Sequence, residues 1–251
     1  MLRIAVLLML RASGADSGAA LQPTEVLNGE LPRWMRFSGE YRSRFEDQEH
    51  MLWRPGNSDR YLLSRLRLGL AIQPAPWLVF FGQAQDSRIF IARRSPNQPP
   101  YQDSLDLRQA YAQLGDGVKF PLQLRVGRQE FSYGEERLVG LSNWHNIGRS
   151  FNAVKLTVTA KKFGGLKMDV FAASVVATRE ARWDTSVPGD NLHGAYALFD
   201  KLWSGGTVEP YFYWRLSPSV ATETGGQAKM NTGSLGLRLT RKLTPKWYAS
   251  S

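Results

Sequence analysis

Hydrophobic and polar residues alternate with a period of two in two runs near the middle of the chain. The first run, LQLRVGRQ, covers residues 122–129, and the second, AVKLTVTA, covers residues 153–160. Successive side chains of a β-strand point to opposite faces, so each run predicts a strand with one apolar face and one polar or cationic face. The same pattern fits a soluble sheet or a membrane sheet, and the apolar environment has to be decided from other features.

The same alternation recurs along the rest of the chain, and a period of two over such lengths is a strong signal for strands. The predicted strands cover residues 36–46, 61–73, 77–87, 107–114, 122–129, 153–160, 166–178, 192–199, 208–216 and 234–240, and Trp247 begins one more. We therefore predict an all-β chain with ten strands and the start of an eleventh.

The connections between the predicted strands alternate between long polar loops and short turns. The long loops cover residues 47–60, 88–104, 132–150, 179–190 and 217–229. Bacterial outer-membrane barrels have long outer loops and short inner turns. The strands are also near the ~9–11 residues that a tilted strand needs to cross a bilayer, whereas ordinary strands have about five or six. The pattern favours an antiparallel transmembrane β-barrel whose apolar parity faces lipid over a soluble β fold.

The N-terminus predicts the compartment. A positive start, an apolar run over residues 4–10 and a stretch of small residues resemble a short secretory signal peptide. An ordinary N-terminal tail is the alternative, because Arg11 shortens the apolar run. We divide the chain into a signal peptide (residues 1–20), a polar lead (residues 21–32) and a partial outer-membrane barrel domain (residues 33–251).

Charge narrows the class of partner. Lys and Arg number 32 against 22 Asp and Glu, a net charge of +10 that attracts nucleic acid, anionic lipid or acidic polysaccharide. A nucleic-acid-binding protein would carry aromatic and basic residues on the same face. Here most basic residues share parity with Gln, Glu and Thr, while most Trp and Leu take the other parity. This distribution favours a wet lumen and argues against nucleic acid.

Strand parity alone places a set of cations on the polar, inward face. They are Arg42, Arg44, Arg65, Arg67, Arg125, Lys155, Arg215 and Arg238. Glu40, Asp169 and Glu209 are expected to brace these cations in salt-bridge ladders. Arginine can hold a carboxylate with two hydrogen bonds, and rings of Arg or Lys select anions in pores. For any single cation, stabilisation of the wet interior is an equal alternative to contact with a substrate.

No motif in the chain indicates catalysis or a cofactor. Ser142 with His145 is the only nearby Ser–His pair at the outer rim, and no histidine has metal-ligand spacing. Cysteine is absent, which excludes disulfides and thiolate metal sites. We expect no enzymatic activity, no cofactor and no metal site.

The segment that joins the two central strands resembles a known family. It reads VGRQEFSYGEERLVGLSNWHNIGRSFNAVKL, with a GRQ strand end, a YG-x-x-R-L loop and a W-x-N-x-GRSF-x-x-V re-entry. LRQAYAQL (residues 107–114) and TGSLGLRL (residues 232–239) occur in the expected order around it. Over roughly residues 33–248 the chain is similar to the alginate export family of outer-membrane porins.

The resemblance implies a monomeric barrel, typically of about eighteen strands, whose arginine-lined pore passes an anionic polyuronate outward. It also implies that Arg108 and Arg128 lie at the pore constriction. Strict alternation instead places Arg128 with Val126, and Arg108 with Ala110, on the lipid-facing side. A bulge at Gly127 would resolve the conflict for Arg128.

The strand count departs from the family pattern, so we expect the chain to represent the N-terminal half to two-thirds of a larger barrel. Such a partial sheet is not expected to conduct alone, because unpaired strand edges are not tolerated within lipid.

We predict an outer-membrane porin for passive export or diffusion of an anionic polysaccharide or oligosaccharide such as alginate. The expected partners are this polymer, outer-membrane lipid and components of periplasmic secretion, with no nucleic acid and a monomeric state. The alternatives are a structural or enzymatic outer-membrane barrel, or a soluble basic β protein that binds a polyanion.

Overall fold

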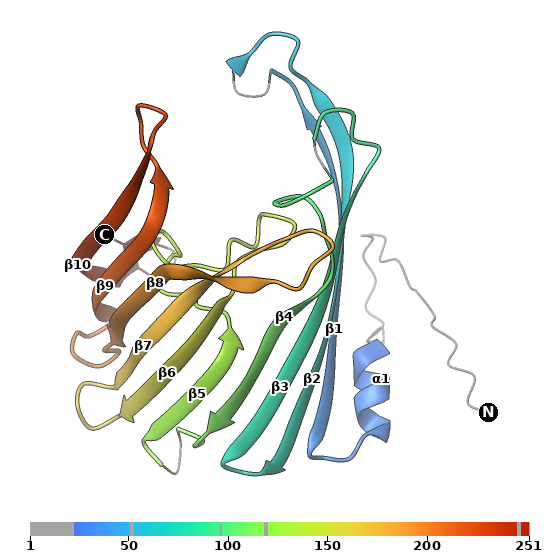
Figure 1. Cartoon of the computed structure of the whole chain (residues 1–251). Helices are drawn as coiled ribbons and strands as arrows, with labels where there is room; N and C mark the ends of the chain where they lie inside the picture. Colours follow the sequence, from blue (N-terminus) through green and yellow to red (C-terminus); the bar gives the residue numbers. More distant parts are fainter. Residues whose placement is uncertain (1–22, 51–52, 96, 118–119, 245–246, 251) are drawn as a thin grey trace.

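The computed structural model describes residues 23–50, 53–95, 97–117, 120–244 and 247–250. Figure 1 shows one curved antiparallel sheet in which the strands follow chain order. The elements are α1 (Pro23–Glu30), β1 (Met35–Gln48), β2 (Asp59–Ala75), β3 (Leu78–Phe90), β4 (Asp103–Leu114), β5 (Leu122–Gln129), β6 (Phe151–Ala160), β7 (Leu166–Ala177), β8 (Thr185–Leu198), β9 (Gly206–Ala221), β10 (Gln227–Thr244) and β11 (Trp247–Ser250).

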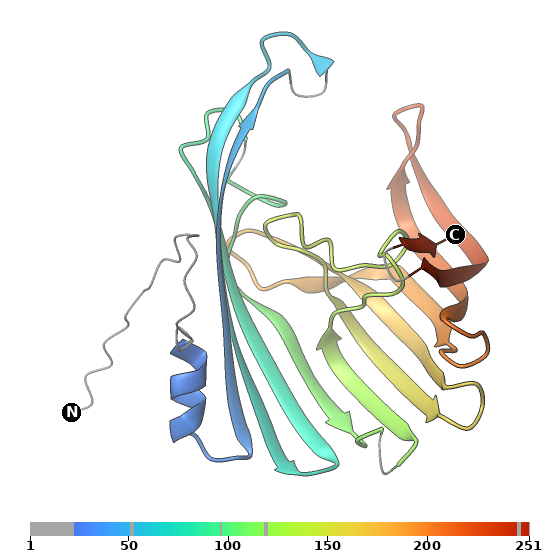
Figure 2. The ribbon, with the colours of Figure 1, turned by 180° about the vertical axis from the view of Figure 1, so that it is seen from behind.

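The prediction of an all-β, antiparallel chain is confirmed, with ten long strands and a short β11. Each strand pairs with the next one along the chain, from β1 with β2 to β10 with β11. Within the described ranges no ladder joins β1 to β10 or β11. The sheet is therefore open, and β1 and β10 stand at its opposite sides (Figures 1 and 2).

The polar lead contains a short helix that the hydrophobic pattern did not predict. The side chain of Asn28 in α1 bonds the backbone of Phe37 in β1, with Nδ2 donating to the carbonyl at 2.8 Å and Oδ1 accepting the amide at 2.7 Å. This two-way bond holds α1 beside β1 (Figure 1). No helix in the described part of the chain is long and apolar enough to cross a membrane. The predicted signal peptide lies outside the described residues.

Two predicted loops are partly strand, which corrects their boundaries. β8 begins at Thr185, and the turn residues Pro188-Gly189-Asp190 lie inside it, where the pairing with β7 shifts register between Ser174 and Val176. The predicted loop 217–229 is similarly shortened to a turn between β9 and β10. Turn residues are compatible with a strand at such an irregularity, because no regular ladder hydrogen bond is required there.

The two faces of the sheet differ sharply in exposure. Arg65 and Arg67 of β2 are 3% and 5% exposed, whereas Leu66 and Leu68 between and beside them are 40% and 42% exposed. We call the face that carries Arg65 the inner face and the opposite one the outer face. Residues 130–150, the inner loop, fold back within the curve of the sheet and cover the inner face (Figure 2).

The hydrophobic core lies between the inner loop and β6–β9. Phe131 of the loop lies 5.0 Å from Phe151 and 4.6 Å from Phe171, measured between ring centroids. Tyr133 stacks on Phe171 at 5.6 Å and on Tyr196 at 4.8 Å. Each such pair contributes about 0.5–1.5 kcal/mol beyond area burial. The inner loop is thus the second layer that a single sheet otherwise lacks.

Gly127 gives a test of the β4–β5 pairing. Its φ is +126°, which L side chains rarely adopt. A Cβ at this position would also meet the carbonyl oxygen of Ala110 and lie 2.8 Å from Cα of Tyr111. Gly127→Ala should lower the free energy of unfolding by about 1–3 kcal/mol or more. Gly82→Ala is the matched control, since nothing lies within 4 Å of its Cβ position. Urea unfolding in detergent micelles measures both, and equal effects would contradict the register.

Candidate functional site

The inner face carries the cations predicted from strand parity. Arg42, Arg44, Arg65 and Arg67 lie together on β1 and β2, while Arg125 and Lys155 lie on β5 and β6, Arg215 on β9 and Arg238 on β10. The structure therefore brings four of them together beneath the inner loop and distributes the rest along the sheet.

The strand register places like charges directly opposite each other. Arg42 faces Arg65 across β1–β2, and Arg125 faces Lys155 across β5–β6. Like charges at opposed positions destabilise a sheet. One member of each pair has an acidic partner, since Arg65 bonds Glu40 and Lys155 Nζ lies 3.3 Å from a carboxylate oxygen of Asp169. For the other member, Arg42 or Arg125, the described residues form no ion pair.

Arg42 and Arg125 are held by neutral groups. Arg42 donates to the backbone carbonyls of Asn143 and His145 at 2.6 and 3.0 Å. Arg125 donates to Oε1 of Gln113 at 2.7 Å, and its guanidinium lies 4.2 Å from the ring centroid of Tyr111. In the part of the chain that the structure describes, neither forms an ion pair. Neither guanidinium is therefore committed to a carboxylate there, although Glu40 and Glu46 lie near enough to attract that of Arg42.

The three acids predicted to brace the cations each contact at least one of them. Besides its bond to Arg65, Glu40 Oε2 lies 3.6 Å from Nη1 of Arg67. Glu209 Oε1 lies 2.7 Å from Nη1 of Arg238, and Arg238 Nη2 lies 3.0 Å from Oε1 of Glu135 in the inner loop. These ion pairs hold the long cationic side chains in defined positions.

A β-bulge brings Arg108 to the inner face. Gln109 pairs with Gln83 and Leu107 pairs with Ala84, so Arg108 is the extra residue on β4. Its side chain is buried, and Nη2 lies 2.6 Å from Oε1 of Glu130 at the start of the inner loop. The bulge explains why strict alternation placed Arg108 on the opposite side.

The register gives Arg128 the parity of the outer face, as strict alternation predicted. The β4–β5 and β5–β6 ladders keep register through Gly127, so no bulge turns the side chain inward. Its guanidinium donates to the carbonyl of Leu107 at 2.8 Å, to Oδ1 of Asn152 at 3.1 Å and to the carbonyl of Asp184 at 2.7 Å. Arg128 thus links β4, β6 and Asp184, the residue directly before β8.

The inner loop was predicted as an outer polar loop, and the structure instead docks it on β1–β4. Its backbone carbonyls accept hydrogen bonds from inner-face side chains: Trp144 from Arg44 at 2.6 Å, Ile147 from Gln85 at 3.0 Å, and Asn146 from Ser87 at 3.1 Å. The loop therefore narrows the space bounded by the sheet, because it occupies the same face as the cations.

Asn146 and Gly148 fix the docked loop. The Asn146 side chain is 2% exposed, and its Nδ2 lies within 3.2 Å of the carbonyls of Ser64, Arg88 and Tyr101. Gly148 has a φ of +84°, and a Cβ there would lie 2.7 Å from Nη2 of Arg108. The W-x-N-x-G spacing was the sequence signal for this arrangement, although nothing in it revealed that the loop turns inward.

A cavity of about 160 Å³ lies beside Arg238, between the inner loop and β8–β10. Its lining includes Tyr133, Tyr196, Tyr211 and Tyr213 together with Glu135. The tyrosine rings offer apolar surface and hydroxyl groups of the kind that contact a sugar ring, while the guanidinium of Arg238 is already paired with Glu209 and Glu135.

The turn between β7 and β8 extends across the sheet to β4 (Figures 1 and 2). Glu180 accepts hydrogen bonds from the side chain and amide of Ser104 at 2.8 and 3.1 Å, and the Asp184 amide donates to Oδ2 of Asp106 at 2.9 Å. Burial and the nearby carboxyl of Asp103 raise the pKa of Asp184 to about 8. This acidic contact was not predicted from the sequence.

Ser142 and His145 meet through their backbones. The His145 amide donates to the Ser142 carbonyl at 3.0 Å, and within the described ranges no side-chain hydrogen bond joins the two residues.

A family comparison matches most of the chain. The profile described as alginate export matches residues 33–248, from just before β1 into β11. No curated protein matches the chain. The match includes every inner-face cation and the whole inner loop.

Asn146→Ala should release the inner loop, because it removes the donor for three buried carbonyls at a cost of about 1–3 kcal/mol. We expect faster hydrogen exchange across residues 130–150, measured by mass spectrometry. Asn143→Ala is the control, since Asn143 is exposed and its side chain only accepts from Arg67 at 3.3 Å. Unchanged exchange in Asn146→Ala would contradict the role given to this side chain.

Proposed function

Because the chain belongs to the alginate export family, we propose that it forms part of the wall, and the constriction, of an outer-membrane channel for an anionic polysaccharide. The observation that carries this proposal is the pairing of like charges on the inner face. Arg42 opposite Arg65 and Arg125 opposite Lys155 have a cost to folding that an anionic solute would offset.

The outer face supports a lipid environment. Large apolar side chains stand exposed on strand after strand, among them Phe80 at 47%, Val154 at 48%, Phe212 at 45% and Leu235 at 85%. A soluble protein rarely exposes a continuous apolar surface of this kind. Such a surface is typical of a membrane-facing or protein-binding site. Lipid contact removes this surface from water without a second protein layer, as on the outside of a membrane barrel.

The inner face supports transit of a polymer that carries carboxylates. An arginine can bind a carboxylate through two hydrogen bonds, and several such positions allow the polymer to pass from one to the next. Conduction requires each contact to be weak enough to release. The acidic partners Glu40, Asp169 and Glu209 reduce the net positive charge and so keep binding reversible.

The inner loop supplies the constriction in this proposal. It lies on the inner face and brings Glu130 and Glu135 to the cations Arg108 and Arg238. A strand edge within lipid needs a partner, so β1 and the opposite edge of the sheet pair with further strands in the membrane. The polymer, outer-membrane lipid and periplasmic secretion components are the partners that this role requires.

Arg125 tests the charge argument most cleanly, since its partners in the described structure are neutral. In planar bilayers the wild-type channel should select anions and be blocked by polyuronate. Arg125→Gln should lower the anion-to-cation permeability ratio about fivefold, the effect of removing about 1 kcal/mol of attraction. The reversal potential in a salt gradient measures this ratio.

Arg60→Gln serves as the control, because Arg60 is an exposed cation of outer-face parity near the start of β2 that pairs with Asp47. Its reversal potential should equal that of the wild type. Cation selectivity of the wild type, or equal shifts in both variants, would contradict the proposal.

A further inference from the structure

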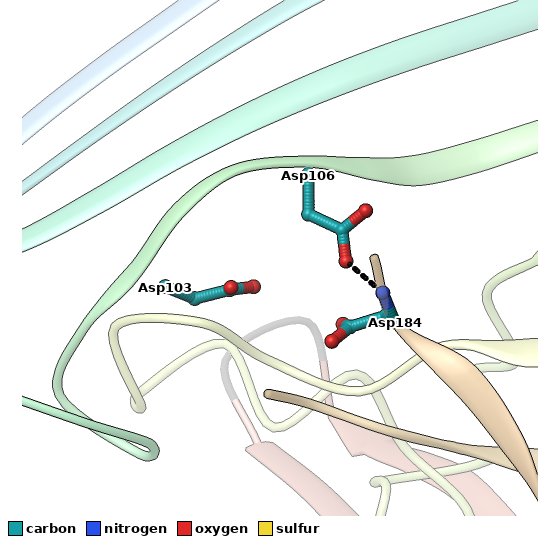
Figure 3. A group of neighbouring side chains, drawn as sticks. All are labelled: Asp103, Asp106 and Asp184. Carbon is teal, nitrogen blue, oxygen red and sulfur yellow. Dashed lines mark hydrogen bonds between the residues drawn. The ribbon is translucent and has the colours of Figure 1, made fainter. Parts of the chain in front are cut away.

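Three aspartates from two separate segments converge beside the wall of the sheet (Figure 3). Asp103 and Asp106 lie at the start of β4, and Asp184 directly precedes β8. One carboxylate oxygen of each lies within 4.8 Å of the others. Asp106 pairs with Gln85 and Asp103 with Ser87 across β3–β4, next to the docking site of the inner loop.

The side chain of Asp103 is buried, and one of its carboxylate oxygens lacks a hydrogen-bond partner among the described residues. Asp103 is 2% exposed and Asp106 is 4% exposed. Among the described residues, none forms a hydrogen bond to Oδ1 of Asp103. Figure 3 shows this carboxylate pointing toward those of Asp106 and Asp184. A buried polar atom without a partner costs free energy, so an unpaired oxygen aimed into an acidic cluster points to a missing cation.

Two cations lie near the cluster, and one of them has an acidic partner elsewhere. Nη1 of Arg128 lies 4.0 Å from Oδ1 of Asp106, the limit of an ion pair. Arg108 lies close in the chain, but its Nη2 is 2.6 Å from Oε1 of Glu130. Three carboxylates thus lie near two guanidinium groups, those of Arg128 and Arg108, and Arg108 also pairs with Glu130.

We propose that Asp103, Asp106 and Asp184 bind a Ca²⁺ ion. An all-oxygen donor set selects hard cations over zinc or copper. Ca²⁺ takes oxygen ligands at about 2.3–2.6 Å, so oxygens on opposite sides of the ion lie roughly 4.6–5.2 Å apart. Three carboxylate oxygens that lie within 4.8 Å of one another can be accommodated in this sphere. Mg²⁺ has distances near 2.0–2.1 Å and retains its water more strongly.

The bound ion fastens the β7–β8 turn to β4. β4 pairs with β5 only between Ala110 and Leu114, so its first residues, from Asp103, lack that neighbour. The β7–β8 turn takes this place through the bonds of Glu180 to Ser104 and of Asp184 to Asp106. Ca²⁺ adds a link between the same two segments and closes the wall above β5.

Terbium luminescence tests the site, since Tb³⁺ has a similar size and the same preference for oxygen. Trp183 adjoins Asp184 and is 71% exposed, so its excitation should sensitise bound Tb³⁺. We expect saturable emission at one equivalent in the refolded chain in micelles, with Ca²⁺ displacing the signal. Trp183→Phe should lower the emission while calorimetry with Ca²⁺ alone still shows binding.

Asp103→Asn and Asp184→Asn should weaken Ca²⁺ affinity at least tenfold, because each replaces a charged ligand with a neutral side chain of similar shape. Asp200→Asn is the control, as Asp200 is exposed in the turn after β8, and its affinity should equal that of the wild type. Circular dichroism confirms strand content in each variant. The site would be overturned if folded wild type bound no Ca²⁺. It would also be overturned if Asp103→Asn and Asp184→Asn bound Ca²⁺ as tightly as the wild type.

Limited trypsin digestion gives a second readout. Arg179 and Arg182 are exposed in the β7–β8 turn, and Ca²⁺ should slow cleavage there in the wild type and Asp200→Asn but not in Asp103→Asn. Equal cleavage with and without Ca²⁺ would contradict the fastening role. Neither readout depends on conduction, so a negative result here is distinct from failure of the channel proposal.

Discussion

The structure depends on the fact that a single layer of β-sheet has two faces and that alternate side chains of each strand must serve different surroundings. One face of this sheet meets the inner loop and carries charge, and the other exposes leucine, valine and aromatic side chains. A shift of register by one residue would exchange the two sets along a strand. The register therefore determines which residues can reach a solute and which can reach lipid.

Departures from strict alternation are where the functional geometry arises. The bulge at Arg108 places an extra guanidinium beside Glu130, while the regular ladder at Arg128 leaves that side chain on the outer parity. The inner loop then links the two halves of the sheet. Its carbonyls bind the arginines of β1–β2, and its aromatic residues pack on β6–β9. Charge and packing thus hold one segment against the whole inner face.

Most of the fold could be predicted from the sequence because period-two alternation is a local property. The strand positions, the antiparallel class and the side of Arg65 or Lys155 all follow from it. The bulge at Arg108 could not be predicted, since it depends on pairing between β3 and β4. The docked loop and the aspartate cluster depend on contacts across dozens of residues, such as Asn146 with Ser64 and Asp184 with Asp106. The predicted start of β8 lies too far along the chain, because typical turn residues occur in an irregular part of this strand.

The central claim is that the inner face is a wet path for an anionic polymer and that the outer face meets lipid. The absence of cysteine in the chain allows a direct measurement, in which Gln123→Cys and Leu124→Cys are labelled in membranes with a water-soluble thiol reagent. These neighbours in β5 lie on opposite faces. The account predicts that Gln123→Cys reacts and is protected by polyuronate, while Leu124→Cys does not react. Equal labelling of both, or faster labelling of Leu124→Cys, would contradict it.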